Sequence, residues 1–266
     1  METIPSEIKL EKSKSSYEEI QKQVRDIRAE LQKTLSELRP QIIKYLAPED
    51  IAEFDNGCIE IYEILNRLES GLIWVTFFGL TSSGKSAISN SLFGDDIAPV
   101  GIEHDLTKEP TCYEKAPWTL VDVPGILGEQ VNEDTAIKEA KRAHGLVFVV
   151  TGEPLGPELK LFETVHNAVP DIPIIVFVNK WDEMQHRPKE DAEKVRSLVN
   201  KKMRKFVKSD EDIVYGNALL FDRELGKMIR QPLPQLIDRM YANAGIFGEV
   251  VQVIDPANRA VNMSAD

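Results

Sequence analysis

The chain has 266 residues, 42% of them hydrophobic and 29% charged, which excludes wholesale disorder and leaves ample length for a large core. Its 32 basic and 44 acidic residues give a formal net charge of −12, so DNA is not expected as a partner, and RNA or an anionic membrane only through a local basic patch. Two cysteines, Cys58 and Cys112, are too few for a disulfide framework, and the chain is expected in the reducing cytoplasm, with peripheral membrane attachment as the alternative.

The N-terminal 70 residues are predicted to be mostly helical. Residues 1–16 are polar and are expected to form a mobile lead-in. Over 17–70, apolar side chains spaced by three and four indicate a long amphipathic helix, which Pro40 should kink or divide, and a second helix from about Pro48. Two interpretations stay open: the 17–70 extension packs on the chain's own domain, or it forms a coiled coil with another copy. The apolar stripe consists of Ile20, Val24, Ile27, Leu31, Leu35, Leu38, Ile42 and Leu46.

From Gly71 the pattern changes to buried strands alternating with helices, which is typical of a doubly wound α/β fold with a mainly parallel sheet. The domain is predicted over 71–243, followed by a weakly patterned tail at 244–266. Expected strands are 72–78, 111–114, 118–121, 146–150, 174–178 and 212–215, and expected helices are 87–93, 134–143, 158–168, 189–207 and 224–242.

A phosphate-binding loop follows the first buried strand. Gly79-Leu-Thr-Ser-Ser-Gly84-Lys85-Ser86 matches the G-x-x-x-x-G-K-[ST] pattern and lies between a strand and a helix, as the pattern requires. The two glycines let the backbone wrap around a phosphate, and the loop amides and helix N-terminus donate to its oxygens. Lys85 would reach the β- and γ-phosphates, and the Ser86 hydroxyl would bind Mg²⁺.

Two more motifs follow later buried strands, at the sheet edge where ligands bind in such folds. Asp122-Val-Pro-Gly125 ends the strand at 118–121; its Asp122 could hold Mg²⁺ through a water, and the Gly125 amide could sense a γ-phosphate. Asn179-Lys180-Trp181-Asp182 follows the strand at 174–178. The Asp182 carboxylate can accept from both the N1–H and the exocyclic amine of guanine, Lys180 can lie along the nucleotide, and Asn179 can tie this loop to the phosphate loop.

In this order and spacing, 79–86, 122–125 and 179–182 resemble the G1, G3 and G4 motifs of the TRAFAC-class GTPases. The resemblance covers about two-thirds of the chain. It implies a guanine contact by the Ala218 amide in Tyr215-Gly216-Asn217-Ala218, and a switch threonine on Mg²⁺ and the γ-phosphate. Thr107 is preferred for that role over Thr111, because 111–114 has the pattern of a strand.

Three features of the sequence resemble particular branches of this class. The proline before Gly125 is similar to the Era-like, dynamin-like and immunity-related branches. The phosphate loop at 81–86 and the N-terminal helical extension are similar to the dynamin-like and immunity-related branches. Ras-like members place a water-orienting Gln where Ile126 stands. The Asn of potassium-activated members is replaced by Ser82, a potential helper in hydrolysis. The large C-terminal helical part of the dynamin-like and immunity-related branches does not appear in the sequence, which leaves open whether the chain is part of a longer protein or a minimal member.

The resemblance implies a Mg²⁺-dependent GTPase, slow on its own and activated by a second copy or another protein. The alternatives are a GTP/GDP-sensing module with negligible turnover and a GTP-controlled, self-assembling, membrane-associated dynamin-like protein. The basic segment 194–208 is interpreted as a solvated helix face or as a contact for membrane or RNA. Expected metal ligands are Ser86, Thr107 and Asp122; expected catalytic groups are Lys85, Ser82, Thr107 and Gly125; expected nucleotide contacts are Gly79, Thr81, Ser82, Ser83, Gly84, Lys85, Ser86, Ala87, Asn179, Lys180, Asp182, Asn217 and Ala218.

Overall fold

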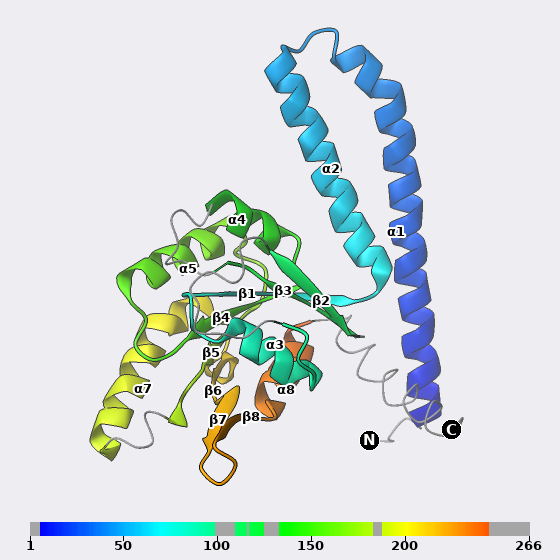
Figure 1. The fold of residues 1–266 in the computed structure, drawn as a ribbon. Helices are drawn as coiled ribbons and strands as arrows, with labels where there is room; N and C mark the ends of the chain where they lie inside the picture. The colour runs from blue at the N-terminus through cyan, green and yellow to red at the C-terminus, as the bar shows by residue number, and fades with distance from the viewer. Residues whose placement is uncertain (1–5, 99–109, 116, 125–132, 183–187, 245–266) are drawn as a thin grey trace. The chain divides into compact units, whose positions relative to one another are not determined.

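The structure is a computed structural model that describes residues 6–98, 110–115, 117–124, 133–182 and 188–244, with side chains from Glu18 onward. The chain divides into two compact units, a helical unit (Met1–Leu72 with Glu249–Asp266) and an α/β unit (Ile73–Gly248). Figure 1 shows both units, and each is described by itself. Within the described residues, every helix is too short or too polar to cross a bilayer.

The helical unit consists of two helices, α1 (Ser6–Ile42) and α2 (Pro48–Ser70). α1 begins inside the segment for which no helix was expected. Pro40 does not divide it; the proline lies in the last turn and the helix ends at Ile42, because proline removes a backbone donor and disfavours continuation. α2 starts with Pro48 in its first turn and ends at Gly71, whose φ of 70° is left-handed.

The α/β unit is built on a six-stranded sheet with the order β2-β3-β1-β4-β5-β6. Within this six-stranded sheet, as far as the structure describes it, β2 and β3 pair antiparallel and the other neighbouring strands pair parallel. The strands are β1 (Ile73–Gly79), β2 (Thr111–Lys115), β3 (Trp118–Asp122), β4 (Gly145–Val150), β5 (Ile174–Val178) and β6 (Ile213–Tyr215). The helices are α3 (Lys85–Phe93), α4 (Glu133–Lys141), α5 (Gly156–Ala168), α7 (Lys189–Met203) and α8 (Pro234–Asn243), with 3-10 turns at Arg204–Phe206 and Asp210–Asp212. The predicted doubly wound α/β fold is confirmed.

The main core lies where α4, α5 and α7 pack against one face of this sheet. Phe148 of β4 is fully buried there, stacked on Phe162 with 4.2 Å between ring centroids and edge-on to Phe206 at 5.8 Å. α3 and α8 cover the opposite face (Figure 1), with Ile88 and Leu236 fully buried. Because helices cover both faces of the sheet, the side chains on both sides of the central strands are apolar, which explains the continuous apolar runs in the sequence.

The predicted helix from Glu224 is wrong at its start. A hairpin of β7 (Leu219–Asp222) and β8 (Lys227–Arg230) forms a separate two-stranded sheet, and α8 begins only at Pro234. The Asp222 carboxylate accepts hydrogen bonds from the backbone amides of Glu224 and Leu225, at 2.8 and 2.9 Å, and Gly226 has a φ of 62°. This side-chain-to-backbone turn competes with helix formation.

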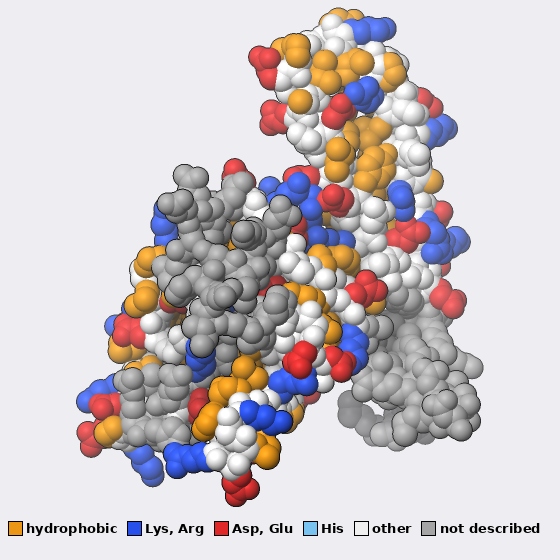
Figure 2. Space-filling model, viewed as in Figure 1, with side chains coloured by type: hydrophobic (Ala, Val, Ile, Leu, Met, Phe, Trp, Pro, Cys, Tyr) orange, Lys and Arg blue, Asp and Glu red, His pale blue; other side chains and the backbone are white. Residues whose placement is uncertain are grey.

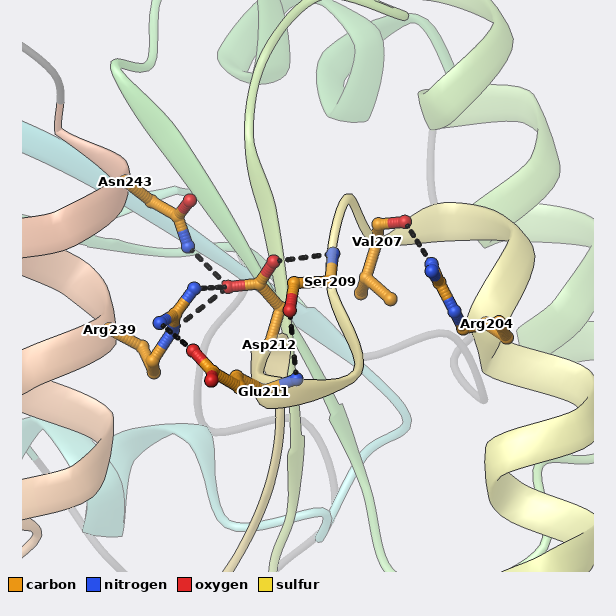
Figure 3. A network of polar contacts seen from close by, with 7 residues as sticks. All are labelled: Arg204, Val207, Ser209, Glu211, Asp212, Arg239 and Asn243. Atoms are coloured by element: carbon orange, nitrogen blue, oxygen red, sulfur yellow. Dashed lines mark hydrogen bonds and ion pairs between the residues drawn. The ribbon is translucent and has the colours of Figure 1, made fainter.

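α8 is held to the start of β6 by a buried carboxylate, shown in Figure 3. One oxygen of Asp212 accepts from Arg239 Nε at 3.0 Å and Nη2 at 2.7 Å, and from Asn243 Nδ2 at 2.8 Å. Its other oxygen accepts from the Ser209 amide at 3.0 Å. Asp212 is 1% exposed, so these donors replace the water that the charge lost on folding.

Candidate functional site

The loop after β1 requires glycine at two places. A Cβ on Gly79 would lie 2.4 Å from the carbonyl oxygen of Val149, and one on Gly84 would lie 2.3 Å from Asn179 Nδ2. Gly84 also has a φ of 95°, and Ser82 has a left-handed φ of 64°. The backbone therefore makes the tight curl that a phosphate cradle needs, directly before the N-terminus of α3.

Lys85 is folded back over this loop. Its Nζ donates to the carbonyl oxygens of Gly79 and Leu80, both at 3.3 Å, and the residue is 7% exposed. Burial lowers the pKa of Lys85, and the Asp122 carboxylate opposes that shift. A cation so poorly solvated gains strongly from an incoming phosphate.

Ser86 and Asp122 are brought together from α3 and β3. The Ser86 hydroxyl donates to one Asp122 carboxylate oxygen at 2.7 Å. The other oxygen, Oδ1, is buried without a hydrogen-bond partner among the described residues, and burial raises the pKa of Asp122 against the effects of Lys85 and Ser86. A hydroxyl and an underused carboxylate are hard oxygen donors, so this pair fits Mg²⁺.

Asn179 connects the loop after β5 with two other loops. Its Nδ2 donates to the Ser83 carbonyl at 2.9 Å, which is the tie to the phosphate loop that the sequence led us to expect. Its Oδ1 accepts from the Ala218 amide at 2.9 Å. Lys180, at a left-handed φ of 58°, donates from Nζ to the Ser82 carbonyl at 3.1 Å. The 179–182 and 216–218 loops are therefore assembled around the phosphate loop.

The two loops also contact each other directly. The Asp182 amide donates to Asn217 Oδ1 at 2.9 Å, and the Trp181 amide donates to the Gly216 carbonyl at 3.3 Å. The Trp181 ring packs against Tyr215, with 4.6 Å between ring centroids. Because the Ala218 amide already donates to Asn179, a guanine oxygen would have to share or replace that bond, and the assignment of Ala218 stays a prediction.

Part of the predicted site lies outside the described residues. Thr107, Gly125 and Ile126 belong to this part. β2 does begin at Thr111, as the strand pattern predicted, and Thr111 pairs with Asp122 across the ladder. The choice of Thr107 as the switch residue stays a prediction.

One supporting residue was missed in the sequence. Asn90 of α3 is 2% exposed, and its Oδ1 accepts from the amides of Ile97 and Ala98 at 3.0 and 2.7 Å. Its Nδ2 donates to the Ala98 carbonyl at 2.8 Å, so it fixes the chain that leaves α3. The available signal was a single amide side chain among the inward positions of a short helix, where burial demands paired hydrogen bonds.

Comparisons with known proteins identify GTPases as similar to part of this chain. Residues 74–180 match the family described as "50S ribosome-binding GTPase". GTPase Era of Corynebacterium glutamicum is 30% identical over 122 residues, which cover 41% of this chain and 39% of that protein. GTPase Der of Gloeothece citriformis is 28% identical over 123 residues, covering 42% of this chain and 27% of that protein. The matched part of this chain therefore spans about two-fifths of the length of Era and about a quarter of the length of Der.

Two solved structures illustrate the likeness in fold. Era in complex with MgGDPNP and a fragment of 16S ribosomal RNA has a TM-score of 0.44 and 17% identity, over 55% of this chain and 51% of that one. Toc33 of Arabidopsis thaliana has a TM-score of 0.46 and 13% identity, over 71% of this chain and 90% of that one.

Proposed function

We propose that this chain, a P-loop GTPase of the Era-like kind, hydrolyses GTP to GDP and phosphate with Mg²⁺. The observation that carries the proposal is the contact between Ser86 and Asp122 at 2.7 Å, beside a buried Lys85. Phosphoryl transfer depends on positioning and charge neutralisation more than on side-chain chemistry, and these three groups supply both.

The proposed division of labour follows the geometry. Ser86 and Asp122 would hold the magnesium ion, which when bound would help to neutralise the negative charge of the phosphates. Lys85 would exchange its two carbonyl contacts for the β- and γ-phosphates, since its ammonium group is already held at the loop. The amides of the phosphate loop would bind the remaining oxygens, while Thr107 and the Gly125 amide would contact the γ-phosphate.

Guanine selectivity is assigned to Asp182. Its backbone amide is fixed by Asn217, so its carboxylate has a defined place at the sheet edge. A carboxylate there accepts from two neighbouring guanine donors that adenine lacks. Asp182→Asn should therefore shift binding from guanine toward xanthine nucleotides, because the amide presents a donor where the carboxylate presented an acceptor.

Slow basal turnover is part of the proposal. Ile126 stands where Ras-like members carry a Gln, and its aliphatic side chain cannot orient the attacking water. We infer that a second copy or another protein completes the site.

A cytoplasmic location is inferred from the composition and the free cysteines.

The same observation at Ile126 favours a second candidate, a sensor that binds GTP and GDP with negligible turnover.

A membrane or RNA contact through 194–208 has weaker support. Lys202 pairs with Glu153 at 2.7 Å, and Lys205 and Arg204 pair with Glu163 and Asp210. With Lys194, which pairs with Asp191 at 3.7 Å, four of the seven basic side chains of this segment form ion pairs within the α/β unit.

The test is turnover of GTP and ATP by the full chain, with and without Mg²⁺, across a wide range of protein concentrations. We expect Mg²⁺-dependent GTP turnover, no ATP turnover, and a specific activity that rises with concentration. Lys85→Ala should abolish turnover, while Lys201→Ala, on the exposed face of α7, should not change it. Tight GDP binding with no turnover at any concentration would favour the sensor, and equal use of ATP would contradict the assignment of Asp182.

A further inference from the structure

The helical unit keeps much of its apolar surface exposed. Among residues 18–72, Val24 and Leu65 are the buried hydrophobic side chains. Ile27, Leu38, Tyr45, Ile59 and Ile61 are all more than two-fifths exposed. Figure 2 shows hydrophobic side chains gathered toward the end of the helical pair at which α1 and α2 are connected. Since most helical stability in proteins comes from burying an amphipathic face, this surface needs a further partner.

Hydrogen bonds and ion pairs of polar side chains also join α1 and α2. Arg39 pairs with both carboxylate oxygens of Asp55, at 2.8 and 2.6 Å. Toward the other end, Arg28 donates to the Glu69 carboxylate at 2.8 Å and Gln21 to the Glu69 carbonyl at 3.0 Å. These contacts join the two helices at two places along their length, in addition to the burial of Val24 and Leu65. The hairpin is thus preorganised to receive a partner, which reduces the entropy lost on binding.

An open groove of about 430 Å³ runs between the two helices near their connection. Each helix contributes residues at i, i+3, i+4 and i+7, the spacing with which helices receive another helix. On α2 these include Ile59, which is 53% exposed, whereas Ile61 lies on another face and does not line the groove. The full lining is Gln32, Leu35, Ser36 and Arg39 of α1 with Asp55, Cys58, Ile59 and Tyr62 of α2.

Charge limits what can occupy this groove. α2 carries seven Asp and Glu against one Arg, whereas α1 has eight Lys and Arg against seven Asp and Glu. An acidic α2 repels phosphate-rich membrane and nucleic acid. It also repels a second α2, but it can lie against the balanced α1 of another copy.

We propose that the α1–α2 hairpin is a dimerisation element, in which the groove receives the hairpin of a second copy with α1 of each copy against α2 of the other. This arrangement buries Ile59 and the other groove residues of both copies, and it separates the two acidic helices. It goes beyond the proposed GTPase activity and does not depend on it, because every residue involved belongs to the helical unit. The dimer therefore forms with or without nucleotide.

The experiment measures the mass of the full chain by sedimentation, as a concentration series without nucleotide, with GDP and with a non-hydrolysable GTP analogue. We expect twice the 30.0 kDa of one chain in all three conditions. Ile59→Asp should raise the dissociation constant at least about tenfold, because it places a charge in the interface. Ile61→Asp is the matched control, on the same helix but away from the groove, and should behave as the wild type. Circular dichroism checks that both variants keep their helices.

Carbodiimide cross-linking of mixed light and isotope-labelled chains tests the arrangement. We expect mixed-label links between α1 lysines such as Lys33 and α2 acids such as Glu53 or Glu60. A monomer at every concentration, an equal loss in both variants, dimers only with the GTP analogue, or α1–α2 links only within one chain would each overturn the proposal. GDP titration of Ile59→Asp keeps the two proposals apart: if no GDP binds, the proposed function fails while the dimer result stands.

Discussion

The two units of this chain differ in what holds them together. The α/β unit buries apolar side chains on both faces of a six-stranded sheet, and Phe148 at its centre is fully enclosed. The helical unit is joined by Arg39–Asp55 and Arg28–Glu69 contacts and leaves isoleucines in solvent. A buried core keeps the side chains of a site in fixed positions, whereas exposed apolar side chains are suited to binding another protein surface. The comparison therefore assigns chemistry to one unit and assembly to the other.

The largest contrast should appear on truncation of hydrophobic side chains. Phe148→Ala removes a ring stacked on Phe162 and edge-on to Phe206, and should lower the free energy of unfolding by about 3–5 kcal/mol. Leu38→Ala, at a site 44% exposed on α1, should change it by less than about 1 kcal/mol. Urea unfolding followed by circular dichroism measures both, and equal effects would remove the distinction between the units.

The buried carboxylate at α8 gives the next effect. Arg239→Gln removes the two bonds to Asp212 and leaves a buried charge with Asn243 and the Ser209 amide alone, so stability should fall by about 2 kcal/mol. Arg204→Gln breaks an exposed pair with Asp210 and should cost no more than about 0.5 kcal/mol. If the two substitutions cost the same in urea unfolding, burial of Asp212 does not explain how α8 is held.

Substitution of a glycine tests the rigidity of the site. Gly84→Ala should weaken GDP binding by about tenfold or more, because the new Cβ would collide with Asn179. A tenfold change in the dissociation constant corresponds to only about 1.4 kcal/mol of binding free energy. Gly94→Ala has a similar left-handed φ of 75° but nothing within 4 Å of the new Cβ. It should cost about 1 kcal/mol of stability from backbone strain and leave GDP affinity unchanged. Calorimetric titration with GDP separates the two, and unchanged affinity in Gly84→Ala would mean that the loops can shift apart.

The smallest effect concerns Tyr215, which packs against Trp181 beside the expected guanine site. Burial raises the pKa of its phenol to about 12, although Arg196 opposes the shift. The folded state thus favours the neutral phenol, so its contribution to stability is complete below the ordinary pKa of 10 and is lost as the pH rises toward 12. Burial also raises the pKa of Tyr113, so absorbance titration should show more than one late tyrosine, and Tyr215→Phe should remove one of these late steps. If every late step persists in the variant, all of them belong to other tyrosines.

The sequence by itself determined the α/β class, the order of the strands along the chain, and the three motifs. Each depends on local spacing: buried strands leave continuous apolar runs, and a phosphate loop needs glycines at fixed intervals. Gly79, Gly84 and Lys85 can therefore be identified from their spacing alone, and Asp122 from its place at the end of a strand.

Only the tertiary structure decided which distant groups meet. The contact between Ser86 and Asp122 joins residues 36 positions apart, and that between Asn179 and Ala218 joins residues 39 apart. The β7–β8 hairpin likewise replaced an expected helix because the Asp222 carboxylate satisfied a turn instead. Sequence periodicity records which side chains share a face, but not which partner covers that face. That is why the long stripe of α1 was recognised, while the groove beside Ile59 emerged only when both helices were in place.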